Sequence, residues 1–187
     1  MRTILDLKPL IQLTEEDFYQ LCQNNPEVPL ELSKNGELII MSPIGGEGGN
    51  KEANLIGRVM MWNLESDLGL VFSSSTIFNL PGGGSRSPDV AWITKEKWDT
   101  LTPIQKKKFP PICPDFVIEL RSPSDRLKPL QEKMQEYLDC GLRLGWLINP
   151  QGKTVEIYRP NKPVETLNLP VSLSGEDVLP GFILLVE

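Results

Sequence analysis

One stretch near the middle of the chain decides the fold, and it reads Asp115-Phe116-Val117-Ile118-Glu119-Leu120-Arg121. Its apolar and β-branched residues make it the most strand-like segment of the sequence. An amphipathic helix is predicted from Arg126 to Cys140, where Gly141 ends it, and another strand from Leu142 to Ile148. This strand–helix–strand unit, preceded by a helix and several strands, predicts an α/β fold with a mixed sheet and helices on its faces.

Further elements are predicted on both sides of this unit. Thr14, with Asp17 three residues later, indicates the start of a helix that continues to about Cys22. Apolar residues recur at helical spacing from Lys51 to about Asp67. Strands are predicted at 36–41, 70–80, 88–93, 154–158 and 165–169, a short helix around 103–108, and a mobile loop or plain turn at the glycine cluster 45–49. Because repeats and low-complexity linkers are absent from the sequence, the 187 residues predict a single domain, 1–187.

The composition excludes several kinds of chemistry. The chain has no histidine, so it holds neither a Ser-His-Asp nor a Cys-His catalytic site, nor a zinc site with imidazole ligands. Cys22, Cys113 and Cys140 lack a Cys-x-x-Cys spacing and predict free thiols in a reducing compartment. We find no signal-peptide or membrane-spanning pattern and expect a soluble, cytoplasmic protein without membrane contact. The net charge of −6 argues against a broad electrostatic surface for nucleic acid, so such contacts must be local or assisted by a cation.

Glu119 is the most unusual carboxylate of the sequence. Alternation along its strand places two sets of residues on opposite faces, Phe116, Ile118 and Leu120 on one, and Val117, Glu119 and Arg121 on the other. Burying a glutamate among apolar side chains is costly unless it is paired or bound to a metal. Taken alone, the pattern favours an internal ion pair between Glu119 and Arg121.

Three other residues carry groups suited to catalysis, although each also has an ordinary structural interpretation. Glu52 lies on the inward stripe of its predicted helix, where an acid in the first turn also favours the helix dipole. Asp89 follows Pro88 at the opening of a strand, a common place for a turn or capping residue. Lys133 flanks the apolar stripe of its helix, where lysines usually extend their ammonium group to solvent.

The order of these residues resembles the PD-(D/E)XK nuclease superfamily, whose members share the restriction-endonuclease-like fold. Pro88-Asp89 matches the PD part of the motif, and Glu119-Leu120-Arg121 matches the (D/E)XK part. The chain is more similar still to one bacterial branch, the Uma family of putative restriction endonucleases, formerly a domain of unknown function. The likeness covers nearly the whole chain and is carried by the motifs at 41–43, 45–49, 86–89, 114–122, 132–133, 137, 141, 146–150 and 179–182.

The resemblance implies both a fold and a site. The fold is a restriction-endonuclease-like α/β/α core, with a central mixed sheet flanked by helices, plus additional C-terminal strands. The implied catalytic residues are Glu52, Asp89, Glu119, Arg121 and Lys133, and the implied metal ligands are Asp89, Glu119 and the backbone carbonyl of Leu120. Arg121 stands where the superfamily has a lysine, and in this branch the lysine function maps onto Lys133, so both residues are candidates for that role.

This donor set predicts a hard cation, because Mg²⁺ binds carboxylates and can activate water for phosphodiester hydrolysis. We therefore expect a DNA endonuclease that uses Mg²⁺, with Mn²⁺ as a substitute, and acts as a homodimer, since twofold symmetry suits cutting both strands. The alternative is a catalytically silent nuclease fold that binds nucleic acid or protein, with Glu119 and Arg121 closed into an ion pair. A third possibility is a metal phosphodiesterase acting on small nucleotides or RNA.

Overall fold

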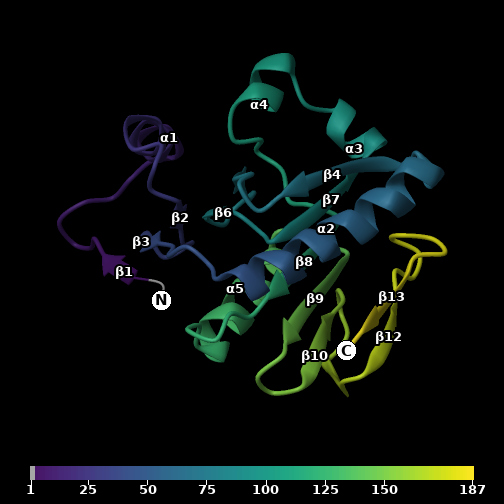
Figure 1. The fold of residues 1–187 in the computed structure, drawn as a ribbon. Helices are drawn as coiled ribbons and strands as arrows, with labels where there is room; N and C mark the ends of the chain where they lie inside the picture. Colours follow the sequence, from purple (N-terminus) through teal and green to yellow (C-terminus); the bar gives the residue numbers. More distant parts are fainter. Residues whose placement is uncertain (1–2) are drawn as a thin grey trace.

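The computed structural model describes residues 3–187, and its largest element is a six-stranded sheet (Figure 1). The strand order is β11 (Glu165–Asn168), β10 (Thr154–Tyr158), β9 (Leu144–Asn149), β8 (Phe116–Leu120), β7 (Val90–Thr94) and β4 (Gly69–Ser73). β8 and β9 run parallel, and the other neighbouring pairs are antiparallel. The sheet is therefore mixed, which confirms the predicted α/β class.

Each face of this sheet is covered by a helix. Alternating residues of β7 and β8 divide between two cores, because Trp92 and Phe116 pack with α2 (Gly46–Ser66), whereas Ile93 and Val117 pack with α5 (Leu127–Asp139). In Figure 1, α2 crosses the strands as a long blue helix. α5 is the crossover that joins the parallel strands β8 and β9, a connection that needs about a dozen residues or more. The result is the predicted arrangement of a sheet between helices.

The N-terminal part of the chain forms a second, smaller sheet. Its strand order is β1 (Thr3–Asp6), β3 (Glu37–Ile40), β2 (Leu30–Leu32), β6 (Ser85–Arg86) and β5 (Phe78–Asn79). The helix α1 (Glu15–Asn24) packs Phe18 against β2, and the predicted capping box between Thr14 and Asp17 is confirmed. Two short helices, α3 (Lys95–Asp99) and α4 (Pro103–Lys107), connect β7 to β8.

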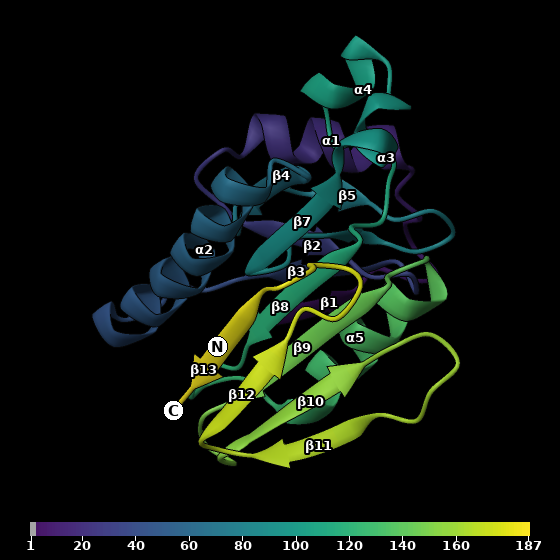
Figure 2. The same cartoon turned by 90° about the vertical axis from the view of Figure 1, so that its right-hand side faces the viewer.

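The chain ends in a hairpin formed by β12 (Val171–Ser174) and β13 (Ile183–Val186). Figure 2 shows this hairpin in yellow beside β9 and β10. Leu173, Phe182 and Leu184 pack into the same core as α2, so the hairpin extends the cover on that face of the central sheet. The expectation of additional C-terminal strands is confirmed, although the sequence patterns located only β10 and β11.

Two sequence predictions need correction. Residues 45–49 do not form a loop, because Gly46 begins α2 and the Lys51 ammonium pairs with the Glu47 carboxylate across the first turn at 2.7 Å. Packing of the later turns of α2 outweighs the low helix propensity of these glycines. The predicted strand 70–80 is divided into β4 and β5, because residues 73–76 form a turn in which the Thr76 amide donates to the Ser73 carbonyl.

Two expectations about membranes and thiols meet direct observations. Within residues 3–187, no helix combines the length and the apolar character that crossing a bilayer requires. Cys22, Cys113 and Cys140 are free thiols, as their spacing predicted. Burial raises the pKa of Cys22 to about 11 and that of Cys113 to about 12, so both thiols stay protonated near neutral pH.

Candidate functional site

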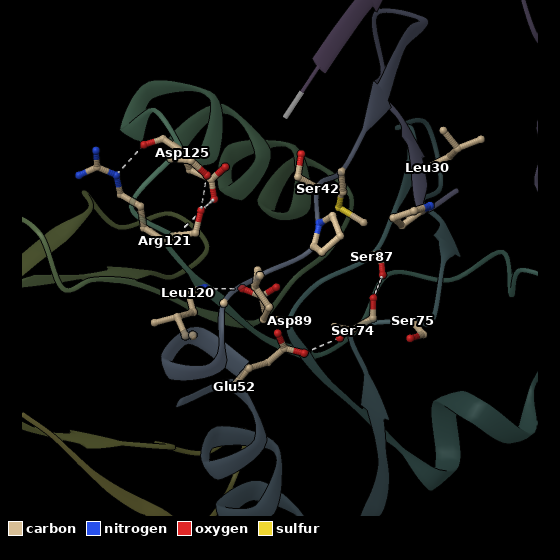
Figure 3. A pocket seen from close by; sticks show the side chains of 18 of the residues that line it. Leu30, Ser42, Glu52, Ser74, Ser75, Ser87, Asp89, Leu120, Arg121 and Asp125 are labelled. Atoms are coloured by element: carbon tan, nitrogen blue, oxygen red, sulfur yellow. Dashed lines mark hydrogen bonds between the residues drawn. The ribbon is translucent and has the colours of Figure 1, made fainter. Parts of the chain in front are cut away.

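A cleft of about 1180 Å³ lies between the N-terminal sheet and one edge of the central sheet. Its lining comes from the C-terminal end of α1, the segment from β3 into α2, the turn after β4, and the segments before β7 and after β8. Figure 3 shows the side chains that meet there. Of the predicted site residues, Glu52, Asp89, Leu120 and Arg121 line the cleft. Glu119 and Lys133 do not, because both side chains are buried behind it.

Asp89 is held at the centre of this cleft by the backbone of β8. It directly precedes β7, in which Val90 pairs with Ile118 of β8. The Leu120 amide donates a hydrogen bond of 2.6 Å to Oδ2 of Asp89. That amide belongs to the peptide group joining Glu119 to Leu120, so the PD and ExR parts of the sequence motif are in direct contact. The predicted adjacency of the two strands is confirmed, with the difference that Asp89 stands one residue before β7, whereas Glu119 lies within β8.

Glu52 reaches the same cleft from the second turn of α2. Its side chain is half-buried, and the Ser74 hydroxyl donates a hydrogen bond of 2.5 Å to Oε1. Ser74 is fixed in turn, because its carbonyl accepts a hydrogen bond from the Ser87 hydroxyl. Figure 3 shows the Glu52 and Asp89 carboxylates on the same side of the cleft. The predicted inward orientation of Glu52 therefore holds, and it turns this acid toward the cleft.

Glu119 lies on the opposite side of β8, beneath α5. It has no exposed surface, and its Oε1 lies 2.7 Å from the Lys133 ammonium and 3.1 Å from the donating Tyr137 hydroxyl. Lys133 is only 2% exposed, so the interpretation of this lysine as a solvent-directed side chain is wrong. The turns of α5 bring Lys133 and Tyr137 onto one face, four residues apart, which is why both reach Glu119.

Lys133 also belongs to a larger buried network of charges. Its ammonium donates to Oε1 of Glu31 at 2.7 Å and to the Ser87 carbonyl at 3.0 Å. The Arg86 guanidinium contacts Oε2 of Glu31 at 3.1 Å and Oε2 of Glu136 at 2.5 Å. Burial opposes the charged form of Arg86, but the Glu31 charge and the hydrogen bond to Glu136 outweigh it and raise its pKa. Arg86 and Lys133 lie near the site residues in the sequence, but their side chains form ion pairs with buried carboxylates.

Arg121 is directed away from Glu119. Its Nε donates to the Asp125 carbonyl at 3.0 Å, and its NH1 donates to Oδ1 of Asn149, also at 3.0 Å. Figure 3 shows the guanidinium at the far side of the cleft from Glu52 and Asp89. The structure pairs Glu119 with Lys133, where the sequence pattern favoured Arg121. β8 ends at Leu120, so the strand alternation that placed Arg121 beside Glu119 no longer holds one residue later.

Sequence reasoning missed Glu31 and Glu136, which complete the buried network. Glu31 is fully buried in β2 between Leu30 and Leu32, a short strand that the patterns did not locate. A glutamate between two leucines was the one available signal. Glu136 lies three residues after Lys133 on α5, so helical spacing places it on the same side as that lysine. Its role becomes evident only when Arg86 is brought opposite.

The buried tyrosines give this region a measurable pH dependence. Burial, the Glu119 and Glu31 charges and the hydrogen bond to Glu119 raise the pKa of Tyr137 well above its ordinary value. Burial and the hydrogen bond to Glu156 likewise raise the pKa of Tyr158. Below the unfolded-state pKa, both folded and unfolded chains keep these phenols protonated, so stability is unaffected. At higher pH only the unfolded chain ionises them, and the free energy of unfolding falls.

We therefore expect two of the three tyrosines, Tyr137 and Tyr158, to contribute no ionisation when the native protein is titrated and followed by near-ultraviolet absorbance. All three should ionise after unfolding in urea, which serves as the control. Tyr137→Phe and Tyr158→Phe should each leave the native titration curve unchanged and reduce the unfolded one. Reversible ionisation of Tyr137 or Tyr158 in the folded protein would contradict the burial described above.

The donors facing the cleft suit a hard cation. Glu52 and Asp89 offer carboxylate oxygens, and Mg²⁺ is commonly held by one or two carboxylates with water and substrate phosphate as further ligands. Across residues 3–187, no group of three or more acidic or thiol side chains is close enough together to hold a metal. Glu52, Asp89 and Glu119 therefore do not converge as a three-carboxylate cluster. These donors fit a cation whose coordination is completed by the substrate phosphate better than they fit a permanently bound cation.

Comparisons with known proteins show the family and the fold of the chain. A family model described as "Putative restriction endonuclease", named Uma2, matches residues 15–187. The crystal structure of a putative nuclease belonging to DUF820, from Anabaena variabilis, is similar in fold, with a TM-score of 0.67 and 21% sequence identity. The match covers 80% of this chain and 82% of that one. No curated protein matches the sequence.

Proposed function

This chain belongs to the Uma2 family of putative restriction endonucleases, and from that premise we propose that it hydrolyses phosphodiester bonds in DNA with the help of Mg²⁺. The observation that carries the proposal is the position of Asp89 and Glu52, whose carboxylates face one cleft from two different elements. Asp89 contacts the peptide that follows Glu119, which brings the Pro-Asp and Glu-x-Arg parts of the sequence motif together.

Asp89, Glu52 and the Leu120 carbonyl are the groups that would hold the cation. Mg²⁺ bound there would neutralise phosphate oxygens and acidify an attacking water. The Leu120 amide fixes the orientation of the Asp89 carboxylate, and the Ser74 hydroxyl fixes that of Glu52. The first turn of α2 also lines the cleft, where its positive helix end favours a phosphate.

Of the ligands that the sequence motif implies, Glu119 is the one that does not line the cleft, so we place it behind these three groups, with Lys133 in the role of the superfamily lysine. Lys133 and Tyr137 hold the Glu119 carboxylate in one orientation from α5. Arg121 is less suited to this role, because its guanidinium is directed to Asn149 and Asp125 and cannot act as a base. In this proposal the Lys133 ammonium balances the charge of Glu119 beneath α5, and the Asp89 and Glu52 carboxylates act in the cleft.

Removal of the cation tests the proposal directly. A labelled DNA substrate should be cleaved with Mg²⁺ or Mn²⁺, should survive with excess EDTA, and should be cleaved again when Mg²⁺ is restored. We expect the loss with EDTA to exceed about 10³-fold, because several kcal/mol of transition-state stabilisation come from the ion. Cleavage that persists in EDTA would contradict the metal-dependent mechanism.

A binding module without catalysis is the second candidate, and the burial of Glu119 favours it. A carboxylate that is fully buried and already pairs with Lys133 exchanges that contact for a cation only at a cost. A protein that binds DNA but releases no product with any divalent ion would support this alternative. A pooled screen that includes RNA and small nucleotides distinguishes the DNA endonuclease and the binding module from a phosphodiesterase that acts on those substrates.

A further inference from the structure

The charge of the cleft is unusual for a protein that acts on DNA. Among the described residues that line it, four are acidic, namely Glu47, Glu52, Asp89 and Asp125. Two are basic, Lys51 and Arg121. Interfaces with duplex DNA are normally far more positive, because Lys and Arg side chains replace the counterions of both phosphate backbones.

The two basic side chains are also already engaged. The Lys51 ammonium lies 2.7 Å from the Glu47 carboxylate, one turn earlier on α2. Arg121 donates to the Asp125 carbonyl and to the Asn149 side chain. Affinity for nucleic acid in this cleft must therefore come mainly from something other than a row of cation–phosphate contacts.

The cleft offers apolar surface in place of positive charge. Leu30, Met41, Ile44 and Ile77 line it together with Val28 and Phe109. Two of these side chains are substantially open to solvent, Ile44 at 49% and Val28 at 39% exposure. Val28 lies in the segment before β2 and Ile44 in the segment before α2, whereas the Asp89 carboxylate comes from the residue before β7 and the Glu52 carboxylate from the second turn of α2. Figure 3 shows Leu30 on the far side of the labelled serines from Arg121 and Asp125.

We propose that the cleft binds unpaired nucleotides, so that the substrate is single-stranded DNA or a frayed, looped or extruded part of a duplex. The inference rests on the nuclease function proposed above and specifies its substrate. Exposed base faces would pack on the apolar lining that includes Val28 and Ile44, as bases do on the apolar platforms of proteins that bind single strands. One phosphate would meet the cation held by Asp89 and Glu52. In a paired duplex the bases are stacked inside and cannot supply this contact.

Binding and cleavage measured side by side test the inference. Fluorescence anisotropy would compare a labelled strand of about 15 nucleotides with its blunt duplex, in Ca²⁺, which takes the same oxygen ligands. We expect the single strand to bind at least about tenfold more tightly. Its affinity should depend weakly on salt, with a log–log slope no steeper than about −2, because few phosphates are neutralised. The cleavage rates of both substrates would be measured in Mg²⁺.

Matched variants separate the apolar surface from the fold. Ile44→Ser and Val28→Ser should each weaken single-strand binding about fivefold, since apolar area buried against a base is lost. Leu185→Ser is the control, because this leucine is 60% exposed on β13 and does not line the cleft. It should leave binding unchanged. Thermal unfolding of all three variants would show that the fold is retained.

The possible failures are distinguishable. Preferential binding and cleavage of the duplex, with a steep salt dependence, would overturn the inference and leave the nuclease function intact. Tight single-strand binding that depends on Ile44, without cleavage, would support the inference and overturn the nuclease function. Single-strand binding unaffected by Ile44→Ser and Val28→Ser would overturn the proposed base contact. Absence of both binding and cleavage would overturn both proposals.

Discussion

Asp89→Asn is expected to abolish Mg²⁺-dependent DNA cleavage, with a loss of about 10³-fold or more and an unchanged fold. The cation supplies several kcal/mol to phosphodiester hydrolysis, and an amide is a much weaker ligand for Mg²⁺ than a carboxylate. The hydrogen bond from the Leu120 amide can still be accepted by the Asn oxygen, so the backbone contact between the segments at β7 and β8 is retained. Initial rates on labelled DNA would measure the loss of cleavage, and calorimetric titration with Mn²⁺ would measure the loss of cation binding.

Glu47→Gln provides a control for the charge of the cleft. Glu47 also lines the cleft, but its carboxylate is largely exposed and pairs with Lys51 within α2. It should change the cleavage rate by less than about threefold, because an exposed ion pair contributes little. Equal rates for the wild type and Asp89→Asn would show that the site is assigned to the wrong residues. Equal losses in both variants would instead point to a general effect of charge.

The central sheet was predictable because its signals are local. Alternation in residues 116–120 assigned Phe116 and Ile118 to one face and Val117 and Glu119 to the other, and the two cores confirm that division. The spacing of apolar residues on α2 correctly turned Glu52 inward. Patterns of this kind depend on a few neighbouring residues, and the burial that they report is repeated along the whole element.

The partners of the buried charges could not be predicted in the same way. Glu31 and Lys133 are 102 positions apart in the sequence, and the short strand that holds Glu31 gives little periodic signal. Whether Glu119 pairs with Arg121 or with Lys133 depends on where β8 ends and how α5 packs across it. Both are properties of the tertiary structure. The first turn of α2 was missed for a related reason, because the packing of its later turns overrides the low propensity of glycine.

Lys133→Met is expected to lower the free energy of unfolding by about 3–5 kcal/mol, because it leaves the Glu31 and Glu119 carboxylates buried without their shared cation. Arg121→Met is the matched comparison, since this half-buried cation contacts only neutral oxygens in the hydrogen bonds described above. Its loss should cost about 1 kcal/mol. Urea unfolding followed by circular dichroism measures both values, and cleavage is measured on whatever folded protein remains.

The double variant Glu31→Gln/Lys133→Met should be more stable than the two single changes predict together, by about 1–3 kcal/mol. Removing one carboxylate along with the cation leaves less uncompensated charge, so the two effects are coupled. Simple additivity would show that the Lys133–Glu31 contact does not stabilise the fold.

For activity, Arg121→Met should reduce cleavage less than about tenfold, because we assign the superfamily lysine role to Lys133. A folded Arg121→Met variant without activity, beside an active Lys133→Met variant, would reverse that assignment and place the cationic side chain just after β8 instead of on α5.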